Sequence, residues 1–325
     1  MIPTVRAKPL ITVCIATYNQ QELIQSAVMS ALSQRSEEFD LEILIGDDAS
    51  TDGTPKILSR LELEYPKWVR VVNHAINMGA ALNYKFLISV ARGQFIAHLD
   101  GDDYWLPEKL ARQIVFLANN TDCIAVYSNA IVVDVNGDLR GIFTNDQPSK
   151  ISITYLLERG NFINHSSLLY RSEAVCALTA LKYPLIDYRI HIELAKSGKL
   201  GFINDTLVAY RTSAPLSMLK NSPGHVRTMY YEALSSAIEH LNSKTRCDTV
   251  ANYALNRYRD KLRTHDDNDF WADFWKLVDL AQMSSIEFIV SIVRRFLQLA
   301  TYALKSTIIS GISEPKHLMV FHPRI

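Results

Sequence analysis

Cysteine, net charge and long apolar runs are all scarce in this chain of 325 residues, and each scarcity excludes a class of protein. The four cysteines lie far apart, form no CxxC pair and mostly sit in apolar surroundings, which is typical of reduced core thiols and predicts a cytoplasmic compartment. The 34 basic and 34 acidic side chains cancel, so no overall basic field exists to hold nucleic acid. We therefore expect no nucleic-acid partner.

No uninterrupted apolar run is long enough to span a bilayer. The first residues, MIPTVRAKPLITVCIATYN, hold a short apolar stretch without a cleavage-site pattern, which predicts a first strand and not a signal peptide. Residues 285–310 are apolar at helical spacing but carry four charged side chains. They predict an amphipathic helix that does not cross a membrane.

The apolar stripe of that helix allows two interpretations. It packs on the rest of the protein or on a second subunit, or it lies on the cytoplasmic membrane face, where Arg294, Arg295 and Lys305 would meet anionic lipids. A lipid-linked acceptor would make the second arrangement useful. The stripe consists of Ile289, Ile292, Val293, Phe296, Ala300, Ala303 and Leu304.

The chain does contain enough apolar residues for a large core, at 48%, and a regular alternation of elements. Strand-like segments at 10–16, 41–46, 68–73 and 94–99 alternate with helix-like segments at 21–34, 54–65 and 81–93. This alternation predicts right-handed βαβ units, and hence an α/β fold with a mostly parallel, Rossmann-like sheet flanked by helices.

Polar clusters follow these strands, namely TYN at 17–19, DDASTDGT at 47–54, NMG at 77–79 and DGDD at 100–103. Loops at the carboxyl ends of parallel strands line one crevice, where such folds bind ligands. Because like charges gathered near a core need a cation, we expect Mg²⁺ or Mn²⁺ with a bound diphosphate there. The acids that should converge are Asp47, Asp48, Asp100 and Asp102.

The regular alternation stops after the DGDD cluster. A helix is predicted at 107–120, opened by Pro107, and a β-hairpin at 123–138 around the turn NGD. Residues 150–215 mix helices with short strands and should add a second wall to the crevice. We therefore divide the chain into a domain at 1–215, with a nucleotide-binding half at about 8–105 and an acceptor half at about 106–215, and a helical region at 216–325.

Taken together, TYN, EILIGDDASTDGT, NMG, ARGQFIAHLDGDDYWLPEKL and AKSGKLGFINDTLVAYR resemble family-2 glycosyltransferases of the GT-A fold, over roughly the first two thirds of the chain. The resemblance implies transfer of a sugar from a nucleotide-diphosphate donor to an acceptor hydroxyl, with inversion and a divalent metal. It also implies a role in building a bacterial surface polysaccharide or glycolipid, on a saccharide or lipid-linked acceptor.

The resemblance assigns the metal to the DGDD loop. Asp102 is the implied direct ligand, Asp100 would contact the metal through water or hold the ribose hydroxyls, and Gly101 lets the backbone pass close to the ligand. The competing interpretation is an acidic turn that caps the helix beginning near Pro107. With the other loops included, the metal site explains the acids better.

The first two loops correspond by the same resemblance to the nucleotide pocket. Thr17, Tyr18 and Asn19 would line it, and Asp48 would accept a hydrogen bond from a base N–H or a ribose hydroxyl. The other polar side chains of the second loop have a structural alternative, because they equally satisfy turns and helix N-termini. These are Asp47, Ser50 and Asp52.

Asp187, in LIDYRIHIELA, is the implied general base that takes the proton of the acceptor hydroxyl. The family commonly carries two acids there, but here the first position is Ile186, and Asp187 would alternatively cap the following helix. Ser213 is a second departure, because many relatives carry a ligand histidine at that position. Arg211 near the diphosphate and His165 near the acceptor are weaker candidates.

Two other functions fit part of this pattern. A nucleotidyltransferase also uses an α/β sheet, a metal and carboxylates, but it usually has a Gly-rich basic loop after its first strand, and TYNQQEL contains neither Gly nor Lys. A catalytically inactive GT-A scaffold is excluded only by activity. The enzymatic interpretation predicts a cytoplasmic glycosyltransferase. If the helix at 285–310 lies on the membrane, the enzyme is bound peripherally at the inner face of the cell membrane.

Overall fold

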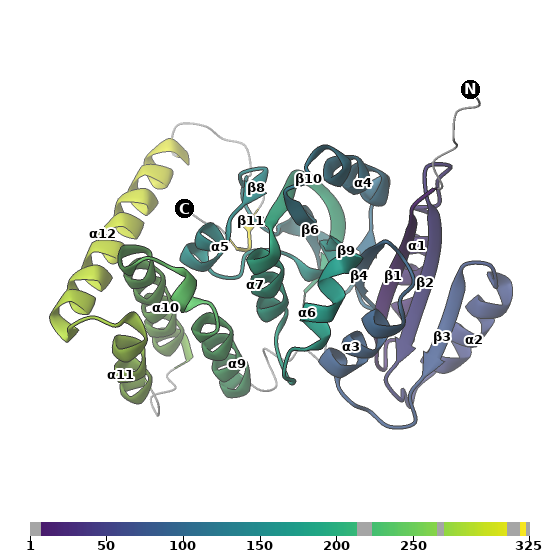
Figure 1. The fold of residues 1–325 in the computed structure, drawn as a ribbon, viewed down its shortest axis with the longest axis horizontal. Helices are drawn as coiled ribbons and strands as arrows, with labels where there is room; N and C mark the ends of the chain where they lie inside the picture. Colours follow the sequence, from purple (N-terminus) through teal and green to yellow (C-terminus); the bar gives the residue numbers. More distant parts are fainter. Residues whose placement is uncertain (1–7, 213–222, 265–269, 311–318, 323–325) are drawn as a thin grey trace.

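The computed structural model describes residues 8–212, 223–264, 270–310 and 319–322 (Figure 1). Its centre is one sheet in the order β11-β7-β6-β9-β4-β1-β2-β3. The four neighbouring strands at one end of this sheet are parallel to each other, as the alternating pattern predicted. They are β1 (Leu10–Thr17), β2 (Asp40–Asp47), β3 (Val69–Asn73) and β4 (Phe95–Asp100).

Helices cover both faces of the sheet, and each face has its own apolar core. Within β1, Ile11, Val13 and Ile15 point into one core and Cys14 into the other, because successive strand residues face opposite sides. The first core is covered by α1 (Ile24–Leu32), α2 (Thr54–Glu64) and α4 (Lys109–Asn119). The second lies under α3 (Ala80–Val90), α5 (Ile153–Arg159), α6 (Val175–Thr179) and α7 (Asp187–Ser197).

Antiparallel strands extend the sheet in the second half of the chain. β6 (Cys123–Val133) and β7 (Leu139–Ile142) form the predicted hairpin, and β9 (Leu169–Arg171) pairs antiparallel with both β4 and β6. Two short 3-10 helices, η1 (His165–Ser167) and η2 (Ser172–Ala174), flank β9. The long β10 (Lys199–Arg211) runs parallel to β6 and pairs with the two-residue strands β5 (Tyr104–Trp105) and β8 (Lys150–Ile151).

The C-terminal part is helical, as predicted, with one addition. Its helices are α9 (Pro223–Ser235), η3 (Ile238–His240), α10 (Ser243–Thr264), α11 (Phe270–Ala281) and α12 (Ser285–Ser310). The addition is β11 (Met319–Val320), which returns to the sheet and pairs parallel with β7. The proposed division at residues 215 and 216 lies outside the described residues and stays a prediction.

The helix predicted at 285–310 is α12, and its apolar residues face two ways. Phe288 is fully buried against α10 and α11, and Ile292 is partly buried. The apolar residues on its other side, Ile286, Ile289, Val290, Val293, Phe296 and Leu297, are exposed. Along the described part of the chain, no helix combines the length and the apolar character needed to cross a membrane.

Candidate active site

Loops from all four parallel strands meet at the carboxyl edge of the sheet. β1 lies between β2 and β4, with Ala16 opposite Asp100 of β4 and Thr17 opposite Asp47 of β2. The backbone N–H of Asp48 then donates to the carbonyl of Thr17 at 3.0 Å. The acids of the second loop and those of the DGDD loop therefore lie at the same edge of the sheet.

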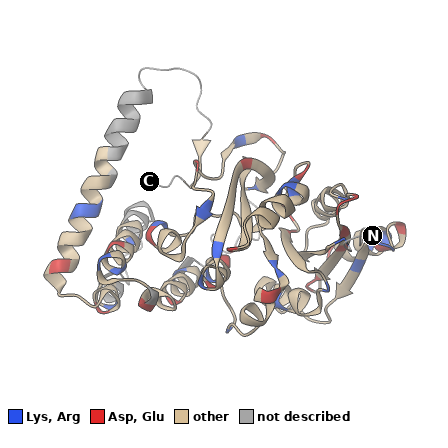
Figure 2. Cartoon of the chain, turned by 45° about the horizontal axis from the view of Figure 1, so that its top comes forward, with Lys and Arg blue, Asp and Glu red and all other residues tan. Residues whose placement is uncertain are grey.

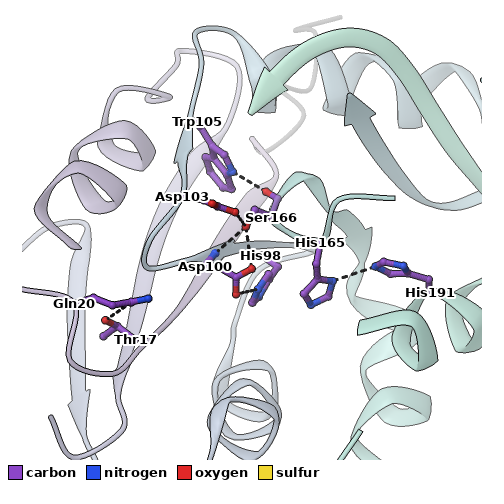
Figure 3. Close-up of polar contacts among 9 residues, drawn as sticks. All are labelled: Thr17, Gln20, His98, Asp100, Asp103, Trp105, His165, Ser166 and His191. Carbon is purple, nitrogen blue, oxygen red and sulfur yellow. Dashed lines mark hydrogen bonds and ion pairs between the residues drawn. The ribbon is translucent and has the colours of Figure 1, made fainter. Parts of the chain in front are cut away.

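The loop after β1 is tied to the loop after β2. The N–H of Asn19 donates to Ser50 Oγ at 2.8 Å, and Asn19 has a φ of +51°, a left-handed backbone that asparagine tolerates well. Thr17 is 3% exposed and its hydroxyl donates to Gln20 Oε1 (Figure 3), whereas Tyr18 is only half-buried. Hydrogen bonds therefore fix the loop that carries the predicted nucleotide-binding residues at the carboxyl edge of the sheet.

Asp48 joins the second loop to the third. Its carboxylate is 2% exposed and accepts the N–H of Met78 at 2.9 Å and that of Gly79 at 2.8 Å. Asp47 and Asp52 accept hydrogen bonds within their own turn, and Asp52 also holds the first loop, as the structural alternative predicted. The contact of Asp48 with a nucleotide stays a prediction.

Ser166 of η1 holds two acids of the DGDD loop (Figure 3). Its Oγ lies 3.1 Å from Asp100 Oδ2 and 2.6 Å from Asp103 Oδ2. Asp103 is 2% exposed and also accepts the N–H of Arg211 at 2.9 Å. Among the described residues, Asp102 shares no hydrogen bond with another side chain. Its carboxylate is therefore the one left to bind a ligand.

Gly101 brings this loop against the loop after β1. A Cβ at this position would lie 2.2 Å from Gln20 Oε1 and 3.0 Å from Thr17 Cβ, so a larger residue would have to displace the Gln20 side chain. The helix that follows, α4, begins at Lys109 and not at Pro107, because Glu108 adopts a left-handed φ of +66°. No side chain caps α4, so the helix-capping interpretation of the acids is wrong.

Burial and mutual repulsion shift the ionisation of these acids. Burial, and then the charge of Asp100, raise the pKa of Asp102 to about 6. Burial and the neighbouring acids raise the pKa of Asp103 well above its ordinary value. Burial also opposes ionisation of Asp100, but the ring of His98 and the hydroxyl of Ser166 outweigh it and hold the pKa of Asp100 below its ordinary value.

The acids of the DGDD loop fit a hard divalent cation. The described residues contain no group of three His, Cys, Asp or Glu side chains able to hold a metal. Mg²⁺ and Mn²⁺ nevertheless commonly take only one or two protein carboxylates and complete their shell with water and substrate phosphates. Asp102, with its unshared oxygens, and the half-exposed Asp100 form such a pair. Burial raises the pKa of Asp102 most, and the charge of Asp100, which a cation would neutralise, raises it further.

Asp187 faces the same group of acids from α7. It is the first residue of the helix and Ile186 is the N-cap, so Asp187 is not the N-cap residue that the alternative interpretation predicted. Burial, and then the charge of Asp100, raise the pKa of Asp187 to about 6, while backbone N–H groups at the helix start oppose the shift. Asp187 is therefore within electrostatic reach of Asp100.

The two weaker candidates have structural contacts. Arg211 lies with its guanidinium 5.1 Å from the ring centre of Tyr104, and its charge acts to lower the pKa of Asp102. His165 hydrogen-bonds His191 and packs against His98, so it belongs to a buried group of rings next to Asp100. Ser213 lies outside the described residues.

Sequence reasoning missed His98 and Ser166. Both contact Asp100, His98 from two residues earlier on β4 and Ser166 from 66 residues away. The only signal for His98 was a polar ring inside the apolar strand segment QFIAHL, and Ser166 in NHSS carried none.

A large groove of about 980 Å³ lies elsewhere, at the amino ends of β1–β3, but its buried acid Glu42 is already paired with Arg92. The convergent acids, with the unshared carboxylate of Asp102 among them, favour the carboxyl edge as the active site.

The sequence model for glycosyl transferase family 2 matches residues 12–175, which include the loops after β1, β2, β3 and β4, as well as η1 and β9. The chain belongs to this family. An uncharacterized protein of Mycobacterium tuberculosis is 32% identical over 200 residues, which cover 61% of this chain and 57% of that protein. The chain therefore matches little more than half the length of that relative.

Another relative and a solved structure agree with this membership. The Escherichia coli enzyme WfaP, named a UDP-Glc:α-D-GlcNAc-diphosphoundecaprenol β-1,3-glucosyltransferase, is 29% identical over 192 residues, covering 58% of this chain and 71% of WfaP. The crystal structure of Staphylococcus aureus TarS residues 1–349 with UDP-GlcNAc superposes with a TM-score of 0.57 at 17% identity, covering 76% of this chain and 72% of that one. This likeness shows the GT-A fold of the family-2 glycosyltransferase.

Proposed function

We propose that this family-2 protein transfers a sugar, with inversion, from a nucleotide-diphosphate donor to an acceptor hydroxyl. The observation that carries the proposal is the meeting of the acid-bearing loops at the carboxyl edge of β1, β2 and β4, with Asp187 of α7 near enough for the charge of Asp100 to raise its pKa. It joins the acids suited to a metal-bound diphosphate and the acid suited to a base in one site. The donor bound to TarS, UDP-GlcNAc, supports a nucleotide sugar as substrate.

Asp102 would hold Mg²⁺ or Mn²⁺ directly and Asp100 would hold it through water. When bound, the cation would neutralise the negative charge that develops on the leaving diphosphate. Arg211, whose charge already acts on Asp102, would add a second positive group on that side. The nucleotide end of the donor would lie against Thr17, Tyr18, Asn19, Asp48 and Gly101.

Asp187 would act as the general base of a single displacement. The acceptor oxygen forms its bond to the anomeric carbon while the bond to the diphosphate oxygen breaks, and the hydroxyl proton passes to the Asp187 carboxylate. Burial raises the pKa of Asp187 to about 6, so the group remains largely ionised at neutral pH and is a stronger base than an ordinary carboxylate.

A screen of UDP-, GDP- and dTDP-sugars for Mn²⁺-dependent thermal stabilisation and hydrolysis tests this function. One of the donors should stabilise the wild type and be hydrolysed. Asp187→Asn should keep the stabilisation and lose turnover, whereas Glu193→Gln on the same helix, paired with Lys196 at 3.2 Å, is the matched control and should keep both.

Three outcomes, two from that screen and one from a parallel assay with a nucleoside triphosphate, would contradict the proposal. Release of pyrophosphate from a nucleoside triphosphate would indicate a nucleotidyltransferase, and donor binding without turnover would indicate a scaffold. A protein that ignores every activated sugar with either metal would exclude donor chemistry altogether.

We also propose a lipid-linked acceptor in surface polysaccharide or glycolipid synthesis, reached at the inner membrane face through α12. Ile286, Val290 and Phe296 on its outer side are 75%, 60% and 58% exposed, and Figure 2 shows few charged positions along this helix. A contiguous exposed apolar face marks an interaction surface. WfaP is named for a diphosphoundecaprenol-linked acceptor, and such a substrate is held in a membrane.

The apolar face, and not charge, should carry this membrane contact. Arg294 pairs with Asp248, and Arg295 contacts Asn252 and Gln298, so the arginines expected to meet anionic lipids are already engaged. The side chain of Lys305 lies outside the described ones. Binding to vesicles should therefore depend little on their content of anionic lipid.

Flotation with phosphatidylcholine vesicles, with and without phosphatidylglycerol, tests the contact. The wild type should float with both, Val290→Glu should not, and Val135→Glu, at a 58% exposed site beyond β6, should float like the wild type. A Val290-dependent dimer that ignores vesicles would assign the face to a second copy of the chain.

A further inference from the structure

Three histidine rings form a line from Asp100 to helix α7 (Figure 3), in which His98 and His191 are buried and His165 is partly exposed. His98 Nε2 lies 2.9 Å from Asp100 Oδ1, and the centre of the His98 ring lies 4.1 Å from that of His165. His165 Nδ1 then lies 3.2 Å from His191 Nε2. These residues come from β4, η1 and α7, so the line connects three elements that are far apart in sequence. We call it the histidine line.

Aromatic rings enclose the histidine line and limit its movement. Tyr84 packs its ring at about a right angle against His98, with centres 4.7 Å apart, and Tyr127 does the same against His191 at 5.1 Å. His98 is 2% exposed and His191 is fully buried. In such close packing a ring cannot turn without displacing its neighbours.

The hydrogen bonds of the line have a direction. Asn161 Oδ1 lies 3.2 Å from His191 Nδ1 and, as an acceptor, requires the proton on that nitrogen. Burial lowers the pKa of His191 to about 3, so its ring is neutral and its Nε2 must accept from His165 Nδ1–H. At the other end, His98 Nε2–H donates to the Asp100 carboxylate, so each polar contact of the line has one donor and one acceptor.

Asp100 is held on both oxygens. His98 contacts Oδ1, and the hydroxyl of Ser166 contacts Oδ2 at 3.1 Å, which leaves the carboxylate plane little freedom to rotate. His191, at the far end of the line, stands four residues after Asp187 on α7 and therefore on the same side of that helix.

We propose that His98, His165 and His191 are positioning residues that hold the Asp100 carboxylate at a fixed distance and orientation relative to Asp187. The proposal rests on the proposed function, in which Asp100 serves the metal-bound donor and Asp187 the acceptor. The line sets the separation between the two halves of the reaction, because it joins the loop that carries one acid to the helix that carries the other. Neither His165 nor His191 touches the donor in this arrangement.

Breaking the line at its two ends should have different effects. His98→Phe keeps a ring but frees Asp100, and it should weaken Mn²⁺ and UDP binding by about tenfold to a hundredfold, as loss of a partner to a metal ligand commonly does. His98→Gln retains a donor near the Nε2 position and should recover part of that loss. His191→Phe should lower kcat by about tenfold while the KM for the donor stays within about twofold, because it displaces Asp187 and leaves Asp100 held.

Tyr127→Phe is the matched control. It touches the same ring of His191 and removes a buried hydroxyl that has no hydrogen-bond partner, so it should leave metal binding, KM and kcat unchanged. A loss equal to that of His191→Phe would mean that any change in this packing lowers activity and would overturn the positioning role.

The closing experiment uses two readouts on the full chain. Mn²⁺ titration followed by electron paramagnetic resonance, with and without UDP, measures the Asp100 side, and hydrogen exchange without ligand follows the backbone at 187–191. His98→Phe should weaken Mn²⁺ binding and speed exchange at the start of α7, and His98→Gln should do less of both.

Normal Mn²⁺ affinity together with unchanged exchange in His98→Phe would overturn the proposal. If His98→Phe does not fold, His98→Gln and His191→Phe take its place, and normal Mn²⁺ affinity in the first together with unchanged exchange in both would overturn it. A wild type that binds neither Mn²⁺ nor any nucleotide would instead overturn the proposed function, while the exchange comparison would still decide whether the line couples β4 to α7.

Discussion

Replacing Asp187 by Asn should stabilise the fold at neutral pH while it abolishes transfer. The carboxylate sits in the first turn of α7, where burial and the charge of Asp100 raise its pKa from 3.8 to about 6. The ionised group is therefore less favourable in the folded chain than in the unfolded chain. An amide of the same shape removes this penalty and cannot accept the proton of an acceptor hydroxyl.

The size of the gain follows from the two pKa values. The difference between 3.8 and about 6 corresponds to at most about 3 kcal/mol at pH above 6. Partial access of water to the site reduces this to about 1 kcal/mol, or a rise of about 2 °C in melting temperature for a chain of this size. The gain should shrink between pH 6 and pH 3.8 and vanish below it, because the carboxyl group is then protonated in both states.

Thermal unfolding of the wild type and Asp187→Asn, without metal or nucleotide, checks this at about pH 7.5 and about pH 4. Glu193→Gln on the same helix is the control, because the partly buried Glu193 carboxylate is paired with Lys196 at 3.2 Å, so the substitution should show no gain. A folded Asp187→Asn variant that melts below the wild type at neutral pH would refute the reasoning, and so would one that retains normal turnover.

Three further outcomes are expected. Asp102→Asn should abolish Mn²⁺-dependent nucleotide binding, because it removes the unshared carboxylate, whereas Asp187→Asn should bind as the wild type does. Calorimetric titration measures both affinities. Equal binding by the wild type and the two variants would exclude Asp102 as the ligand. Mn²⁺ affinity should fall as the pH drops below about 6, since protons compete for Asp102, whose pKa burial and Asp100 raise to about 6; a flat pH series of titrations would contradict this. Gly101→Val should weaken UDP binding at least about tenfold, because a Cβ would meet Gln20 Oε1 at 2.2 Å, and adding Gln20→Ala should restore part of the affinity.

Local patterns were enough to predict the four parallel strands, the hairpin after them and the edge at which the acids gather. The segments of β1, β2 and β4 are apolar runs because both of their faces are buried, and their parallel direction brings the loops that follow them to one end of the sheet. The helix at 285–310 was predicted at its full length, since helical spacing of apolar residues is a property of the segment itself. The short strand β11 was missed, because two residues carry no periodicity.

The partners of each acid were decided by the tertiary structure alone. Ser166 reaches Asp100 across 66 residues, and the histidine line joins three elements, because the packing of η1 and α7 against β4 sets these contacts and no local pattern encodes packing over such separations. The same holds for α12, whose sequence shows apolar residues around much of the helix. Only the position of α10 and α11 determines that Phe288 is buried while Val290 stays exposed.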